Sequence, residues 1–323
     1  MSSIVTSPQA LQPRPTSLFV NGYFPRRRWI ITGIGVLAGL LLAYVWYAKL
    51  TDDDIGFNSA NAMLGRDANN TAIGGIGSGI LFAFVAGLAG SFTACNIAVF
   101  GAVGPLLGEG SKSRTSRFKE TLKPLGWMAV GMIPVSAIYG GLVGIMGTRM
   151  PQFSTAVYPH GSVSPRALQT MIVFGGEGLI MIACGLAALG LIPDFLAGVS
   201  KRFPNAPLVL MGALVGGFLI GRPYPLFRDL FRHAANEHNI LYGAGAFVLQ
   251  SIGNMLIMAI LFIVLSYAIG GRVQRWTTEK PSRATVLTAS ALIIAGAYFV
   301  AYWNLRQLDH LGYLWFPTAP WNS

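Results

Sequence analysis

Long apolar runs separated by short polar segments dominate the chain. Each run is long enough, as a helix, to cross a hydrocarbon core about 30 Å thick. Lipid offers no hydrogen-bond partners to a backbone, so helices are the expected spanning elements. The pattern therefore predicts an all-α polytopic membrane protein with seven transmembrane helices. The expected spans cover residues 27–49, 74–108, 124–147, 169–195, 207–226, 240–269 and 284–305.

Composition agrees with this prediction. The chain has 323 residues, of which 53% are hydrophobic and 11% are charged, whereas soluble chains carry about 25% charged residues. A net charge of +11 would suit a nucleic-acid binder, but the basic residues form short clusters between the apolar runs. No basic face interleaved with aromatic residues is present. The expected partner is therefore the lipid bilayer, not nucleic acid.

The distribution of charge predicts an orientation. With the N-terminus inside, the inner segments hold 15 of the 23 Lys and Arg residues but only four of the 12 acidic residues. Cytoplasmic loops carry such an excess of positive charge. We therefore expect a protein of the cytoplasmic (inner) membrane, with the N-terminus inside and the C-terminus outside.

The segments between the spans divide the chain into five parts. The triple arginine of Arg26–Arg28 indicates the inner flank of a membrane anchor, although it also resembles part of a twin-arginine export signal. The expected parts are a cytoplasmic tail (1–25), an N-terminal transmembrane anchor (26–50), an outer loop (51–73), a six-helix core (74–305) and an outer aromatic tail (306–323).

The six spans of the core divide into two sets of three. The second span contains "FVAGLAGSFTACNIAVF" and the fifth contains "ALVGGFLIGRPYPLFRD". Gly87 precedes Cys95 by eight residues, and Gly216 precedes Tyr224 by eight. These two spans run in opposite directions, so the core is predicted to be a 3+3 inverted repeat. Such repeats place their working site near the membrane midplane, where discontinuous helices meet.

Three stretches resemble a known family: "TACNIA", "RPYPLF" and "GEGLIMIACGLAALGLIP". Over residues 74–305 the chain is similar to transmembrane electron-transfer proteins of the CcdA and DsbD type. These act in cytochrome c biogenesis, within the lysine-exporter-like superfamily. The resemblance implies thiol–disulfide exchange between one cysteine in each repeat, with a thioredoxin-like partner inside and an acceptor outside.

The two motif positions depart from the family. Cys95 matches the first cysteine, but Tyr224 occupies the position of the second. Disulfide exchange needs a thiolate that attacks a sulfur, which tyrosine cannot supply. Cys95 is then either a live thiol that uses an external partner or a small residue that packs. Cys184 has a packing role on a face of small residues, or it replaces the missing partner if the two Cα atoms lie within about 7 Å.

Other polar residues near these positions predict a pocket. Thr93 and Asn96 flank Cys95, and Arg222 lies two residues before Tyr224. Glu177 is the one acidic residue well inside an expected span, where a carboxylate usually needs a partner. Arg222 is the candidate partner; alternatively, both side chains reach the outer interface. We expect Thr93, Cys95 and Asn96 to face Arg222 and Tyr224 across the repeat interface. Their polar atoms would then satisfy one another and the backbone groups that a break in the helix sets free.

Motifs for metals and cofactors are missing from the sequence. There is no Walker loop, C-x-x-C, C-x-x-C-H or H-E-x-x-H motif. The four histidines are scattered over expected outer segments and their spacing fits no standard site. Neither a metal nor a cofactor is expected. The four are His160, His233, His238 and His310.

Three classes of function are compatible with these features. The first choice is an accessory or assembly subunit of a larger membrane electron-transfer complex, without the two-cysteine relay. The second is a thiol–disulfide protein that uses Cys95 with an external partner. The third is a transporter of a small solute or ion. The sequence leaves enzymatic activity open and favours its absence.

Overall fold

The computed structural model describes residues 17–47, 56–65, 67, 73–90, 114–153, 161–221, 225–268 and 270–322. Within these ranges the chain is helical and contains no strand. The longer helices are α1 (Arg28–Val45), α3 (Ile76–Ala89), α5 (Arg114–Met146), α6 (Pro165–Ala188), α8 (Ala206–Gly221), α9 (Pro225–Glu237), α10 (Ile240–Ala268), α11 (Gly270–Glu279) and α12 (Ser282–Phe299). The shorter elements are α2 (Asn58–Leu64), η4 (Gly147–Arg149), η5 (Pro151–Phe153), α7 (Ala197–Arg202), the π-helical η6 (Val300–Leu305), α13 (Arg306–His310) and η7 (Pro320–Asn322).

Several of these helices could cross a membrane. Five described helices are long and apolar enough, and α8 with α9 would make a sixth if that bent pair is one span. The five run over Arg28–Val45, Leu122–Arg149, Pro165–Ala188, Ile240–Leu265 and Ser282–His310. These findings agree with an all-α polytopic membrane protein. The structure does not test the predicted number of seven spans, because α3 has only 14 residues and the rest of its expected span lies outside the described residues.

The expected span over residues 207–226 carries the stretch RPYPLF, where the resemblance implies a bend. In the structure α8 ends at Gly221 and α9 begins at Pro225, with an angle of 79° between the two. The sequence between them, Arg222-Pro223-Tyr224, together with Pro225, contains two residues without a backbone N–H. Proline interrupts the helical hydrogen-bond ladder, which accounts for a break here. We treat α8, about 24 Å long, as the spanning part and α9 as a helix across its end.

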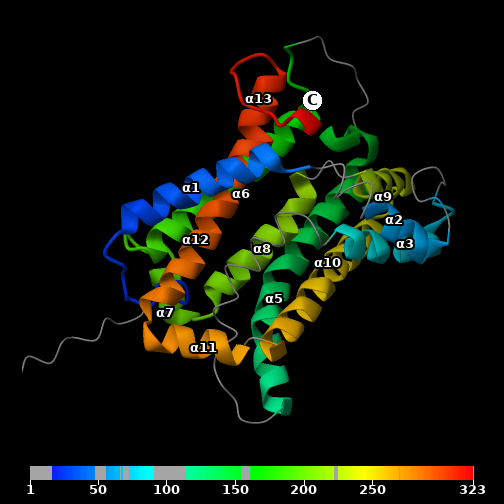
Figure 1. The fold of residues 1–323 in the computed structure, drawn as a ribbon. Helices are drawn as coiled ribbons and strands as arrows, with labels where there is room; N and C mark the ends of the chain where they lie inside the picture. The colour runs from blue at the N-terminus through cyan, green and yellow to red at the C-terminus, as the bar shows by residue number, and fades with distance from the viewer. Residues whose placement is uncertain are drawn as a thin grey trace, which may run out of the picture.

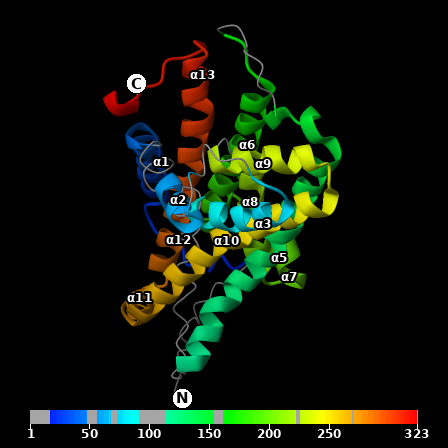
Figure 2. The same cartoon turned by 90° about the vertical axis from the view of Figure 1, so that its right-hand side faces the viewer.

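The large helices pack side by side in the order α3, α10, α5, α8, α6, α12 and α1. Figure 1 shows α1, α12 and α6 on one side of α8, and α5, α10 and α3 on the other. Helix α8 is therefore central, with α5 on one flank and α6 on the other. Figure 2 shows α13 beyond one end of the long helices and α11 beyond their opposite end.

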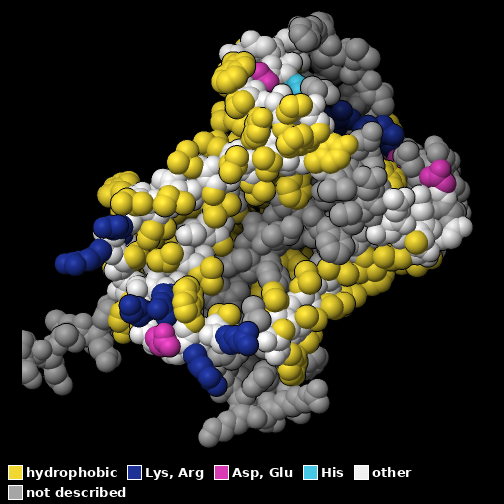
Figure 3. Space-filling model, in the orientation of Figure 1, with side chains coloured by type: hydrophobic (Ala, Val, Ile, Leu, Met, Phe, Trp, Pro, Cys, Tyr) yellow, Lys and Arg dark blue, Asp and Glu magenta, His cyan; other side chains and the backbone are white. Residues whose placement is uncertain are grey.

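At each end of the helix bundle, a hydrogen bond joins segments that are far apart in the sequence. At the α11 end, Arg28 Nη1 donates to the carbonyl of Gly190 over 3.2 Å. At the other end, called the α9 end, the hydroxyl of Tyr313 donates to the carbonyl of Gly161 over 2.8 Å. Figure 3 shows basic side chains at the α11 end, a second group of them near α9, and yellow apolar side chains along the helices between. The positive charge of Arg26–Arg28 and α11 therefore lies on one side of the apolar region.

Glycines bring the helix backbones into close contact. Gly178 of α6 and Gly296 of α12 face each other, and a Cβ on Gly178 would lie 2.8 Å from the carbonyl oxygen of Gly296. Gly140 of α5 and Gly243 of α10 make a reciprocal contact that is closer still. Small residues let membrane helices gain van der Waals contact in the absence of a hydrophobic driving force between them. These contacts fix the register of the α6–α12 and α5–α10 pairs.

We predict that Gly178→Ala destabilises the protein, because the new methyl group collides with the backbone of α12. Overpacking of this kind costs about 1–3 kcal/mol. Gly176→Ala is the matched control, since a Cβ there meets nothing within 4 Å and alanine favours a helix. Thermal unfolding in detergent measures both variants. Equal stability of the two would contradict the close α6–α12 contact.

Candidate functional site

A carboxyl group lies inside the helix bundle. Glu177 is on α6, and only 6% of its surface is exposed. Its Oε1 lies against Gly217 of α8, where a Cβ would collide with it. Glycine at this position therefore leaves room for the carboxyl group between α6 and α8.

The carboxyl group of Glu177 has an incomplete set of partners. Its Oε2 is buried and makes no hydrogen bond within the described part of the chain. A charged group without partners is costly in an apolar interior, so the carboxyl group must bind a proton or a cation. Ionisable residues inside membrane segments commonly mark pathways for ions and protons. Glu177 therefore has the character of a binding group.

Aromatic rings surround Phe174, which lies one turn before Glu177 on α6. The ring centroid of Phe174 lies 6.2 Å from that of Phe218 on α8, 5.5 Å from that of Phe299 on α12 and 4.6 Å from that of Trp303 on η6. Aromatic pairs at such distances add about 0.5–1.5 kcal/mol beyond their buried area. This cluster joins α6, α8, α12 and η6 and makes the surroundings of this turn apolar.

A π-helical segment packs against the same helix. In η6, Asn304 Nδ2 donates to the carbonyl of Met171 over 3.0 Å, and the absence of a side chain at Gly175 leaves room for the amide. The Asn304 Oδ1 and the Trp303 Nε1 are buried without hydrogen bonds inside the described ranges. Single π-helical turns occur frequently at functional sites. Buried polar atoms without hydrogen bonds within the described ranges therefore occur both on α6, at Glu177, and on the η6 segment that packs against it.

A second polar group lies between α5 and α10. The hydroxyls of Ser136 and Ser251 share a 2.7 Å hydrogen bond across this interface. Gln250 is fully buried, and neither its Oε1 nor its Nε2 finds a partner among the residues described. Asn254, one turn further along α10, is 2% exposed. Buried amides without partners are uncommon in folded proteins, so Gln250 is a second candidate for binding.

A hydrogen-bonded chain connects α9 to α10. His233 Nδ1 lies 2.7 Å from the hydroxyl of Tyr242, and its Nε2 lies 3.6 Å from a carboxylate oxygen of Glu237. The net shift of the His233 pKa is downward because of burial, although Glu237 and the backbone of Ile73 act to raise it. The ring is therefore largely neutral at pH 7. This chain holds α9 in place across the end of the bundle.

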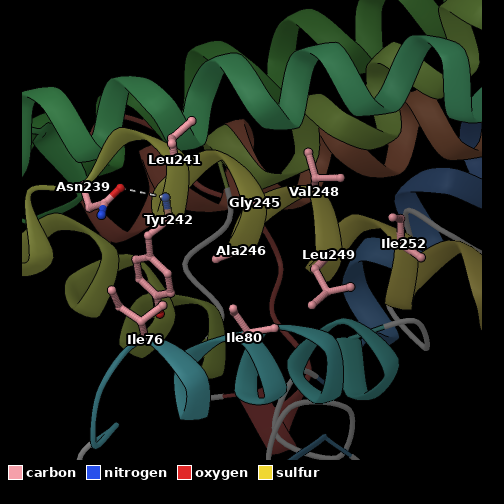
Figure 4. Close-up of a pocket in the computed structure, with 10 residues that line it drawn as sticks. All are labelled: Ile76, Ile80, Asn239, Leu241, Tyr242, Gly245, Ala246, Val248, Leu249 and Ile252. Carbon is pink, nitrogen blue, oxygen red and sulfur yellow. Dashed lines mark hydrogen bonds between the residues drawn. The ribbon is translucent and has the colours of Figure 1, made fainter.

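An apolar groove lies between α3 and α10, away from Glu177. Its volume is about 450 Å³. Figure 4 shows Ile76 and Ile80 of α3 facing Leu249 and Tyr242 of α10 across it. The lining is almost entirely apolar, which suits the hydrocarbon of a membrane and offers no group for catalysis.

Only one of the side chains expected to form the pocket can be located. Thr93, Cys95 and Asn96, and likewise Arg222 and Tyr224, lie outside the described residues, so the expected pocket stays a prediction. Glu177 faces the bundle interior, as its exposure shows.

Cys184 is buried in a core to which α1, α5, α6, α8, α10 and α12 all contribute, with 3% of its surface exposed. Among the described residues, no group of three or more His, Cys, Asp and Glu side chains could hold a metal ion.

The sequence analysis did not identify Gln250, Asn254 or the polar atoms of η6. A signal for the first two was present, because residues 250, 251 and 254 are polar at helical spacing inside an apolar run. No comparable signal marks η6, because tryptophan and asparagine are common near the ends of membrane helices.

We predict that Gln250→Met stabilises the protein while reducing its function. Methionine fills a similar volume and removes two unpartnered polar atoms, whose burial costs about 1–3 kcal/mol. Gln169→Met is the contrasting control, since Gln169 Nε2 donates to the carbonyl of Ile220 over 2.7 Å and its loss should destabilise. Thermal unfolding in detergent measures both. A loss of stability in Gln250→Met would indicate a structural role.

Comparisons with protein-family models, with curated proteins and with solved structures give no match to this chain.

Proposed function

We propose that the protein is a transporter that moves a small solute or ion across the membrane, with Glu177 as the group that binds a proton or cation. One observation carries this proposal: the Glu177 carboxyl group is buried between α6 and α8 with Oε2 unpartnered within the described ranges. A subunit that only supports assembly gains nothing from the cost of such a group. A transporter uses it as a binding site.

The contacts of α3 with α10 and of α8 with α5 support the inverted repeat. Gly87 of α3 packs against Gln250 of α10, and Gly216 of α8 packs against Met132 of α5. Met132 and Gln250 are 118 residues apart. If α3 corresponds to α8, then α5 corresponds to α10 with this shift.

The same shift recurs at other contacts. Gly253 of α10 also packs on Gly87, and Val135 of α5 also packs on Gly216, which again gives a separation of 118 residues. Gly178 and Gly296, which meet where α6 crosses α12, are 118 residues apart as well. One shift thus relates α5 to α10 and α6 to α12, which two copies of one three-helix unit would produce. This supports the 3+3 core within a seven-span protein.

The break between α8 and α9 also favours transport. Inverted-repeat transporters bind their substrates where discontinuous helices meet. Gly217, the residue that faces Glu177, lies one helical turn before the end of α8 at Gly221. The binding group and the break are therefore close together.

The resemblance to the CcdA and DsbD type remains a proposal about the scaffold. Cys184 is buried in the core and thus badly placed for exchange with a soluble partner. A redox role would depend on Cys95 with a thioredoxin-like protein. We therefore propose the family scaffold without its two-cysteine relay, in the inner membrane.

The aromatic tail favours a second candidate function. Tyr313, Trp315 and Trp321 are 65%, 82% and 54% exposed. Aromatic side chains are enriched in protein interfaces as well as at membrane surfaces. An accessory subunit of a larger membrane complex would use this tail to contact its neighbours.

We predict that Glu177→Gln abolishes proton movement by the protein, because the amide cannot bind and release a proton. The purified protein is placed in vesicles of phosphatidylethanolamine and phosphatidylglycerol that contain a pH-sensitive dye. A potassium diffusion potential, negative inside, then drives protons inward. Wild-type vesicles should acidify faster than protein-free vesicles, and Glu177→Gln should match the protein-free rate.

Glu279→Gln is the control for this measurement, since Glu279 is an exposed carboxylate on α11 and its loss should leave the flux unchanged. Wild-type vesicles that acidify no faster than protein-free ones would refute proton transport. Purification in stoichiometric amounts with other membrane proteins would then assign the subunit role.

We predict opposite labelling of two single cysteines placed at the two ends. Both native cysteines are first changed to alanine. In intact cells an impermeant thiol reagent should label Trp315→Cys, in the aromatic tail, but not Lys280→Cys, between α11 and α12. The excess of basic residues at the α11 end is the physical reason. The reverse pattern would overturn the proposed orientation.

A further inference from the structure

Three arginines lie together at the α9 end. Arg166 is the second residue of α6, and Arg228 and Arg232 lie one turn apart on α9. Residues four apart share one face of a helix. All three side chains are half-buried, so each is partly removed from water but still open to a ligand.

Hydrogen bonds place the start of α6 beside the end of α8, from which the chain enters α9. Thr170 Oγ1 donates to the carbonyl of Gly221 over 2.8 Å. Gln169 Nε2 donates to the carbonyl of Ile220 over 2.7 Å. Burial lowers the pKa of Arg228, and the charges of Arg166 and Arg232 lower it further. Arg166 and Arg232 are therefore both close enough to Arg228 to repel its guanidinium group.

Within the described residues this positive cluster is only partly balanced. The ion pair Arg283–Glu279 and the contact of the neutral His233 ring with Glu237 include none of the three arginines. Asp229 interacts with both Arg228 and Arg232 without forming an ion pair, so one carboxylate offsets part of three positive charges. The Arg228 Nε is buried without a hydrogen-bond partner in the same part of the chain. The cluster therefore keeps an excess of positive charge that a bound anion would offset.

We infer that Arg166, Arg228 and Arg232 form a binding site for a phosphate group. Guanidinium groups match the oxygens of phosphate in pairs, and such charge-assisted bonds are stronger than neutral ones. Three arginines offer more donors than one carboxylate can accept. The positive end of the α6 dipole, next to Arg166, adds to the attraction.

Two sources could supply this phosphate group. The α9 end is one end of the apolar helices, where lipid headgroups lie, so a phospholipid is one source. A soluble phosphate compound is the other. The site is separate from Glu177 and does not depend on the proposed transport.

Binding is tested on the full-length protein in a neutral detergent, with thermal unfolding followed by tryptophan fluorescence. One titration uses inorganic phosphate against chloride at equal ionic strength. Another uses short-chain phosphatidylglycerol against short-chain phosphatidylcholine. Saturable stabilisation by inorganic phosphate beyond that by chloride would indicate a soluble ligand. Stabilisation by lipid alone would indicate a headgroup site, and either result supports the inference.

Arg228→Gln and Arg232→Gln should each raise the dissociation constant for the phosphate ligand by about tenfold or more, as expected for the loss of a bond between charged groups. Arg149→Gln is the matched control, because Arg149 is exposed at the same end outside the cluster. A monodisperse elution profile checks that each variant folds. An equal loss in Arg149→Gln, or no stabilisation of the wild type by either kind of phosphate, would overturn the site.

Discussion

The close contact of helix backbones at glycine is the constraint on which the rest of the fold depends. Lipid tails are as apolar as the side chains that face them, so burial of apolar surface contributes little to helix association. Contacts such as Gly178 with Gly296 and Gly140 with Gly243 therefore hold the pairs together. At the α6–α8 interface, the glycine at position 217 likewise leaves room for the Glu177 carboxyl group.

The same close packing makes buried polar groups consequential. Glu177, Gln250 and Asn304 lie in interfaces with little room to rearrange, and each has a polar atom without a hydrogen bond inside the described ranges. Such groups cost stability. A fold that retains them gives up free energy at these positions, which is common where a protein binds or moves something.

The sequence predicted the helices better than their contacts. Apolar runs identify α1, α5, α6, α10 and α12 because lipid selects for length and hydropathy. The prolines at residues 223 and 225 explain the end of α8. Which glycines meet depends on the registers of separate helices, which no local pattern encodes. Gln250 went unnoticed because an amide inside an apolar run has no significance until its partners are known. Most of the expected pocket lies outside the described residues and stays a prediction.

Helix α8 connects the packing to the candidate site. Gly212 and Gly216 on one face of α8 contact Met128 and Met132 of α5, while Gly217 on another face contacts Glu177. A shift of α8 along α5 would therefore change the space around the carboxyl group at the same time. The close contacts of Gly212 and Gly216 with α5, to which the Val135 side chain adds at Gly216, therefore set the position of α8 and the space around Glu177 together. The turn into α9 gives α8 an end that is held by the His233–Tyr242 contact. For the proposed transport, α8 is thus the helix whose packing and whose binding group depend on each other, because its contacts with α5 and the space that it leaves for Glu177 are set by neighbouring glycines.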